Sequence, residues 1–176
     1  LDVLNAMPPF FGGGEMIQDV SLERATYSAL PHKFEAGTPA IAEAVVLGAA
    51  VDYLTHIGIE RIADYEHTLT AYLYERISTI PGLTLYGPKP KADGTGRAAI
   101  ATFTVDGVHA QGLSTLLGQS GIAIRSGHHC TQPLHALLGV SSTARVSLYF
   151  YNTPAEIDAF IAALKETIDF FGSVFE

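Results

Sequence analysis

The segment from Ala144 to Tyr151 alternates between apolar and polar side chains. Successive side chains of a β-strand point to opposite faces, so Val146, Leu148 and Phe150 would share one face of such a strand. The opposite face would carry Arg145, Ser147 and Tyr149. The alternation predicts a half-buried strand, which requires neighbouring strands and a hydrophobic layer beneath it.

The residues after this strand carry the strongest helix-start signal in the chain. Thr153 is a suitable cap, Pro154 suits the first helical position, and Glu156 is placed to complete a capping box. The apolar residues that follow recur at helical spacing, at Ile157, Phe160, Ile161, Leu164, Ile168 and Phe171. We therefore expect a C-terminal amphipathic helix.

The remaining patterns predict a mixed α/β chain. Glycine and proline interrupt residues 1–37, which we expect to form an extended arm. Expected helices cover 38–58, 59–80, 109–119 and 133–138, and expected strands cover 83–86, 98–105 and 122–125. The fold class is α+β, with a short, mainly antiparallel sheet covered by helices. Residues 38–176 would form one α/β domain, preceded by the arm and linking segment 1–37.

Composition narrows the function. Eighteen acidic and ten basic residues give a formal net charge of −8, which repels phosphate backbones and anionic lipids. We therefore expect no nucleic acid or membrane partner. The single cysteine, Cys130, cannot form an internal disulfide, which favours a cytoplasmic or equivalent reducing compartment.

Cys130 lies in the densest cluster of polar residues, the loop 125–133. A nucleophilic thiolate needs nearby positive charge or a helix N-terminus, and this loop offers Arg125, two imidazoles and a following helix. An isolated cysteine is more often a small buried hydrophobe, but these polar neighbours disfavour burial. A zinc site is a weaker alternative because its spacing is poor, and its ligands would be His128, His129, Cys130 and His135.

Two further groups are candidates for binding anions. Arg125 and Arg145 would rise from strands, where guanidinium groups suit a small carboxylate, although structural ion pairs are equally compatible with the pattern. Gly37 and Thr38 would start a helix, where amides and a hydroxyl can hold phosphate, although many such starts serve only as caps.

Together these segments resemble the C-terminal part of the cysteine desulfurases of the SufS/CsdA type, within the class V aminotransferase family that uses pyridoxal phosphate. The Arg-x-Gly-His-His-Cys loop is the most specific landmark. The landmarks follow the family's order, and they are residues 7–10, 12–17, 34–39, 85–88, 125–130 and 151–153. The resemblance implies the small domain of a fold-type I enzyme.

The resemblance also implies residue roles. Cys130 would attack the sulfur of a cofactor-bound L-cysteine, releasing alanine and keeping a persulfide for iron–sulfur cluster assembly. Arg145 would hold the substrate carboxylate, with Arg125 close by, while Thr38 and Gly37 would contact the cofactor phosphate of the neighbouring subunit in a homodimer. The active-site loop would include Gly127, His128 and His129. A SufE-like protein would accept the sulfur.

The lysine that binds the cofactor lies in a part of the family's sequence that these residues do not match. His32-Lys33 imitates the family's His-Lys pair at another position, so we expect Lys33 to be an exposed basic residue. The chain alone is therefore expected to be inactive. Two alternatives remain open: a selenocysteine lyase or another class V pyridoxal-phosphate enzyme, and a non-catalytic or zinc-binding scaffold domain.

Overall fold

The computed structural model describes residues 1–174 and divides the chain into two compact units, the first covering Leu1–His56 and the second starting at Ile57. This division falls later than the sequence boundary after residue 37, because nearly all of helix α2 (Ile41–Ile57) belongs to the first unit. Each unit is described by itself below.

The first unit contains regular elements where the sequence predicted an extended arm. Helix α1 (Asp2–Ala6) precedes an antiparallel hairpin of β1 (Ile17–Val20) and β2 (Ala25–Tyr27), followed by the 3₁₀ turn η1 (His32–Phe34). Ser21 closes the hairpin, because its hydroxyl accepts from the backbone N–H groups of Glu23 and Arg24. The irregular arm was therefore the wrong description of this segment.

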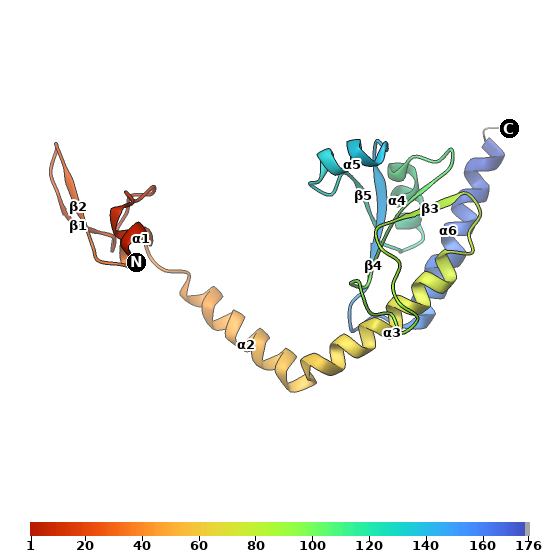
Figure 1. Cartoon of the computed structure of the whole chain (residues 1–176), viewed down its shortest axis with the longest axis horizontal. Helices are drawn as coiled ribbons and strands as arrows, with labels where there is room; N and C mark the ends of the chain where they lie inside the picture. The colour runs from red at the N-terminus through yellow and green to blue at the C-terminus, as the bar shows by residue number, and fades with distance from the viewer. Residues whose placement is uncertain (175–176) are drawn as a thin grey trace. The chain divides into compact units, whose positions relative to one another are not determined.

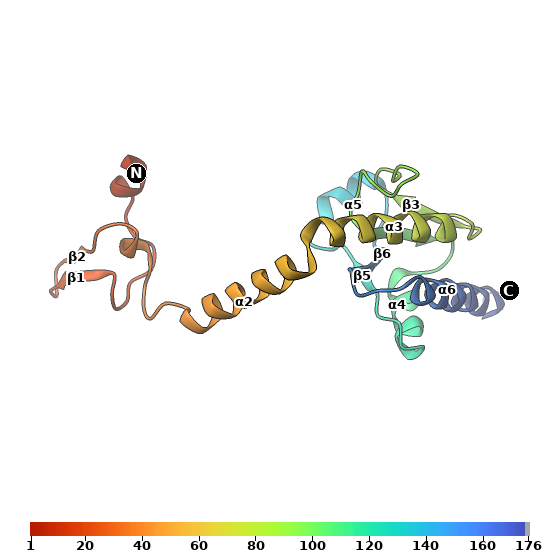
Figure 2. The ribbon, with the colours of Figure 1, turned by 90° about the horizontal axis from the view of Figure 1, so that it is seen from below.

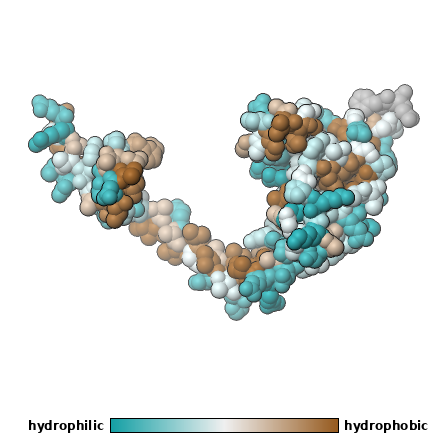
Figure 3. Space-filling model, in the orientation of Figure 1, coloured by the Kyte–Doolittle hydropathy of each residue, from teal (hydrophilic) through white to brown (hydrophobic). Residues whose placement is uncertain are grey.

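Helix α2 begins at Ile41, so Gly37 and Thr38, which were expected to start it, lie before it. None of its residues is buried. Its large apolar side chains are exposed, and Figure 3 shows hydrophobic surface along it; they include Ile41, Val45, Val46, Leu47, Val51 and Tyr53.

The second unit is built on a four-stranded sheet in the order β3-β4-β6-β5. The strands are β3 (Leu83–Tyr86), β4 (Ile100–Val105), β6 (Thr143–Ser147) and β5 (Arg125–Gly127). Every neighbouring pair is antiparallel. The predicted α+β class with a short antiparallel sheet is confirmed for this unit.

Three helices cover one face of this sheet: α3 (Ile59–Ile77), α4 (Ala110–Gln119) and α6 (Pro154–Val174). Figures 1 and 2 show α3 and α6 running side by side. Their apolar stripes meet Ala101, Phe103 and Val146 of the sheet in one core. No single described helix is long and apolar enough to cross a membrane; only the bent pair α2 and α3 passes by length and composition.

The sequence placed most elements of this unit correctly, although α3 ends earlier than predicted, β4 starts later, and both β5 and β6 are shifted. The capping box at α6 is confirmed: Thr153 N donates to Glu156 Oε2 at 2.7 Å, and Glu156 N donates to Thr153 Oγ1 at 3.3 Å. Strand β6 ends at Ser147 rather than at residue 151, because Asn152 folds back and bonds the backbone of Tyr149. Strand β5 starts only at Arg125, since the N–H of Ile122 is held by Leu117 of α4.

Candidate active site

Four residues form a row across the sheet on the face opposite the core. The strand registers place Tyr86 opposite Thr102, Thr102 opposite Arg145, and Arg145 opposite Arg125. Directly opposed residues in antiparallel strands share a face, with their Cβ atoms about 4.5–5.5 Å apart. We call these four residues the cross-strand row. It brings together the two arginines that the sequence singled out.

A cavity of about 410 Å³ is lined by three residues of this row, Tyr86, Thr102 and Arg145. Arg145 lines the cavity, and its Nε is buried without a hydrogen-bond partner among the described residues. Arg97 lines it too, with its Nη1 donating to the carbonyl of Pro88 at 2.6 Å and its guanidinium over the ring of Tyr74. A buried guanidinium N–H without a partner is costly, so the cavity favours an anionic ligand at Arg145. No pattern in the sequence singled out Arg97.

The loop that carries Cys130 leaves the sheet at the end of β5. Ser126 and Gly127 belong to that strand, not to the loop as predicted. Cys130 is exposed, as its polar neighbours indicated. His129 and Cys130 both have positive φ angles, of 50° and 62°. Two consecutive non-glycine residues in this region store backbone strain, which is a feature of functional loops.

Hydrogen bonds hold this strained loop against helix α5 (Gln132–Leu138) and strand β6. Thr131 Oγ1 donates to the carbonyl of His128 at 2.7 Å. His129 Nε2 lies 3.2 Å from the carbonyl oxygen of Thr143 and 3.1 Å from its hydroxyl. His135 Nε2 lies 3.0 Å from the same hydroxyl. The loop is therefore anchored through the buried side chain of Thr143.

The pKa of His129 lies below its ordinary value of 6.5, chiefly because burial disfavours the charged ring. The nearby guanidinium of Arg145 lowers this pKa further, and the charges of His135 and Arg125 act in the same direction. A hydrogen bond with the backbone of Thr143 opposes these effects without cancelling them. His129 is thus neutral at pH 7.

The zinc alternative gains no support from this geometry. Among residues 1–174, no group of three or more His, Cys, Asp or Glu side chains is placed to hold a metal ion. The rings of His128 and His135 meet edge to face with centroids 5.5 Å apart, and both ring nitrogens of His135 face Thr131 or Thr143. These nitrogens act in hydrogen bonds instead.

Gly37 and Thr38 lie in the first unit, so their position relative to Cys130 stays a prediction from the resemblance. Gly37 has a φ of 88°, and its N–H donates to the carbonyl of Gly14 at 2.9 Å. A Cβ at Gly13 would come within 3.2 Å of the Gly37 nitrogen, which explains the glycine there. The Gly37 amide is therefore occupied, whereas Thr38 is exposed.

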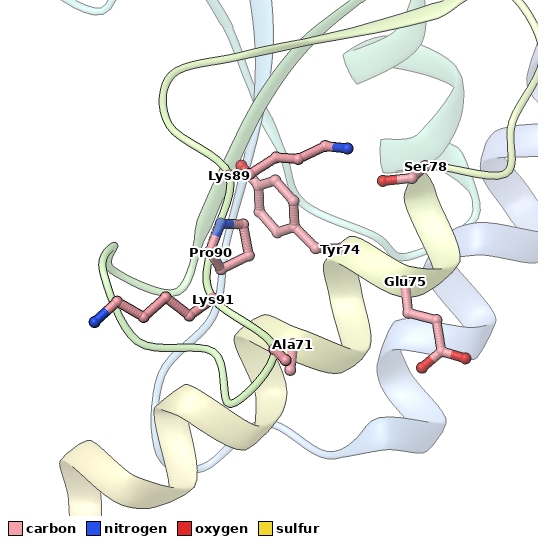
Figure 4. Close-up of a pocket in the computed structure, with 8 residues that line it drawn as sticks. Ala71, Tyr74, Glu75, Ser78, Lys89, Pro90 and Lys91 are labelled. Atoms are coloured by element: carbon pink, nitrogen blue, oxygen red, sulfur yellow. The ribbon is translucent and has the colours of Figure 1, made fainter.

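The lysines lie outside the Arg145 cavity. Lys33 donates from Nζ to the carbonyl of Asn5 at 2.8 Å within the first unit. Lys89 and Lys91 line a separate hollow of about 300 Å³ between α3 and the loop after β3, where Lys91 points away from Tyr74 (Figure 4). No lysine lines the Arg145 cavity within the described part of the chain.

The sequence and the fold of this chain match those of known proteins. Residues 1–160 match the family described as aminotransferase class-V. The chain belongs to this family. A probable cysteine desulfurase from Synechocystis is 61% identical over 170 residues, which are 97% of this chain and 40% of that protein. One from Halobacterium salinarum is 48% identical, covering 96% of this chain and 40% of that protein.

Solved structures agree with this assignment. The cysteine desulfurase CsdA from Escherichia coli, solved as an S-sulfonic acid, has a TM-score of 0.84 and 34% identity, over 96% of this chain and 41% of that chain. The apo cysteine desulfurase of Thermococcus onnurineus has a TM-score of 0.80 and 34% identity, over 92% and 39%. The chain thus spans about 40% of the length of its curated relatives. These shares of length do not bear out the predicted C-terminal placement.

Proposed function

We propose that this chain is part of a pyridoxal-phosphate-dependent cysteine desulfurase, which converts L-cysteine to L-alanine and keeps the sulfur on Cys130 as a persulfide. One observation carries the proposal: an exposed cysteine on a strained loop adjoins a cavity in which Arg145 has a buried, unpartnered Nε. The names of the relatives, which are cysteine desulfurases, support it.

Arg145 binds the substrate carboxylate in this proposal. Its guanidinium presents donors in a fixed fork that matches a carboxylate, and the carboxylate would satisfy the buried Nε. Arg125, opposite it in the sheet, adds a second positive charge on the same face. The two arginines orient the amino acid so that its side-chain sulfur can meet Cys130.

The residues present fit one side of the cofactor site. Arg145 suits the carboxylate of a cofactor-bound amino acid, and the Thr38 hydroxyl would contact the cofactor phosphate, in a homodimer from the neighbouring subunit. The lysine that binds the cofactor covalently would come from the part of the enzyme outside these 176 residues. When bound, pyridoxal phosphate supplies an electron sink for the carbon skeleton of the substrate.

The sulfur step balances without an external oxidant. The Cys130 thiolate attacks the substrate sulfur and forms an S–S bond, while the substrate C–S bond breaks and its electron pair goes to carbon. That carbon takes a proton to give alanine, and Cys130 is left as a persulfide. Because the pKa of His129 is lowered, its ring adds no further positive charge beside Arg145. The substrate carboxylate therefore remains the partner of Arg145.

A sulfur-accepting protein of the SufE type would then take the persulfide to iron–sulfur cluster assembly. Cys130 is accessible for this transfer. Directly after the loop, α5 exposes Leu134, Leu137 and Leu138, and Figure 3 shows hydrophobic surface there. An exposed apolar patch beside a reactive group suits transient docking of such an acceptor.

The experiment uses the full-length enzyme, pyridoxal phosphate and L-cysteine. We expect alanine in solution and a mass gain of one sulfur atom on the peptide containing Cys130. Cys130→Ser should abolish both, whereas Cys130→Ser with undiminished turnover would refute the persulfide role. A parallel assay with selenocysteine compares kcat/KM for the two substrates and tests the lyase alternative.

A further inference from the structure

A directed chain of hydrogen bonds links the Cys130 loop to buried His135. His135 is 4% exposed and Thr143 is 1% exposed, so water does not compete for these bonds. The chain runs from His129 to Thr143, from Thr143 to His135, and from His135 to the carbonyl of Thr131. It connects the residue before Cys130 with the first turn of α5.

The carbonyl groups fix the direction of this chain, because a carbonyl oxygen can only accept. His135 Nδ1 lies 3.0 Å from the Thr131 carbonyl and therefore carries a proton. In a neutral imidazole the other nitrogen, Nε2, is then an acceptor, so the Thr143 hydroxyl donates to it. The Thr143 oxygen keeps its lone pairs for His129.

His129 Nε2 faces two acceptors under this assignment, the carbonyl oxygen and the hydroxyl oxygen of Thr143. Its proton must therefore sit on Nε2. Because the ring is neutral at pH 7, Nδ1 is left unprotonated with a free lone pair. The ring that carries this lone pair lines the Arg145 cavity.

We propose that His135 is a positioning residue that acts through Thr143 and holds His129 in the Nε2–H tautomer, with Nδ1 as a hydrogen-bond acceptor for a thiol at the active-site loop. Its consequence for sulfur transfer rests on the proposed function. Three groups act on the pKa of His129 through their charge: Arg145 on β6, Arg125 on β5 and His135 on α5. None of these three groups can accept the thiol proton in place of His129. The two arginines are charged, and both ring nitrogens of His135 are already in hydrogen bonds.

Without His135, the Thr143 hydroxyl loses its acceptor and becomes able to donate to His129 Nε2. The Nδ1–H tautomer is then no longer excluded, although the Thr143 carbonyl still competes for an Nε2 proton. His135→Met tests this change because methionine fills similar space without the ring nitrogens. Thr143→Ser is the conservative control, since it keeps the hydroxyl.

The direct test is ¹⁵N NMR of histidine-labelled full-length enzyme, with the His129 signals assigned by loss in His129→Gln. The wild type should show a protonated Nε2 and an unprotonated Nδ1, and a protonated Nδ1 would overturn the proposal. His135→Met should give averaged shifts of two tautomers, while Thr143→Ser should keep the wild-type pattern. Unchanged shifts in His135→Met would show that His135 has no positioning role. If that variant does not fold, a protonated Nδ1 in the wild-type spectrum would still overturn the proposal.

A kinetic readout separates this inference from the proposed function. In single-turnover persulfide formation, His135→Met should lower the rate constant about tenfold or more, as for a misplaced acid–base group. KM for cysteine should stay within about twofold, because the arginines are intact. If the full-length enzyme has no desulfurase activity but His129 carries its proton on Nε2, only the proposed function is refuted. If kcat/KM of His135→Met fell only because KM rose, the positioning role would be contradicted.

Discussion

Arg125 lies directly opposite Arg145 in the antiparallel pairing of β5 with β6. Opposed residues of this kind share a face, and their Cβ atoms are about 4.5–5.5 Å apart. The two positive charges therefore repel each other across the paired strands. No acidic side chain forms an ion pair with either arginine among the described residues. In the proposed function, the substrate carboxylate offsets this repulsion.

Arg125→Gln in the full-length enzyme tests this arrangement. Removing the repulsion should leave the free energy of unfolding unchanged or raise it by up to about 0.5 kcal/mol, since Arg125 is exposed and screened. KM for cysteine should rise at the same time. Urea titration and steady-state kinetics measure the two effects, and Arg61→Gln at an exposed position of α3 is the matched loss of charge. A loss of stability without a change in KM would indicate a structural role instead.

Stability should depend on pH through His129. Its pKa is depressed in the folded protein, so the unfolded chain binds the proton first as the pH falls below about 6.5. The stabilisation that depends on neutral His129 is complete above that pH. It is lost as the pH falls through the depressed pKa of the folded state. Denaturant midpoints of wild type and His129→Gln, compared across this window, should converge at the acid end. A gap that widens toward acid pH would contradict the sign.

Phe103 in β4 is fully buried and meets the ring of Phe160 in α6 at a centroid distance of 6.4 Å. Phe103→Ala should lower the free energy of unfolding by about 3–5 kcal/mol, because it leaves a cavity between sheet and helix. Leu137→Ala, at a side chain that is 83% exposed, should change it by less than about 0.5 kcal/mol. Chemical denaturation of the full-length protein gives both values; similar losses would mean that this core is not where the unit is stabilised.

Gly94 has a φ of 83°, and a Cβ there would overlap the backbone carbonyl of His67 on α3. Gly107, with a φ of 72°, has open space around the same position. Gly107→Ala should therefore cost only the left-handed backbone penalty, about 1–2 kcal/mol. Gly94→Ala must also move the loop from α3, and thermal melts should show a clearly larger loss. Equal losses would mean that the loop does not pack closely on α3.

Periodicity predicted the elements whose burial is one-sided. The apolar spacing of Ile157, Phe160 and Leu164 marked the buried stripe of α6, and alternation placed Val146 of β6 on the buried face of its strand. These patterns work because a helix or strand with one buried face must repeat its apolar residues at the period of its backbone. The local sequence around Cys130 likewise predicted an exposed thiol.

Elements without such a period were missed or misplaced. The β1–β2 hairpin buries little, so its strands carry no alternation, and only the Ser21 hydrogen bonds define its turn. The end of β6 depends on Asn152 bonding back to Tyr149, a contact that alternation does not encode. His135 could have been paired with Thr131 from their helical spacing, but its bond to Thr143 depends on the fold.

The cross-strand row also limits how this sequence can change over evolutionary time. Its four residues share a face only because three strand pairings keep their register. Inserting or deleting one residue within β6 would turn Arg145 toward Phe103 and the hydrophobic core. Ala144 or Val146 would then take the place of Arg145 in the cross-strand row. Length variation should therefore accumulate in the polar loop 88–96 and be absent from β4 and β6, so the spacing of these strands would be inherited together with the proposed substrate site.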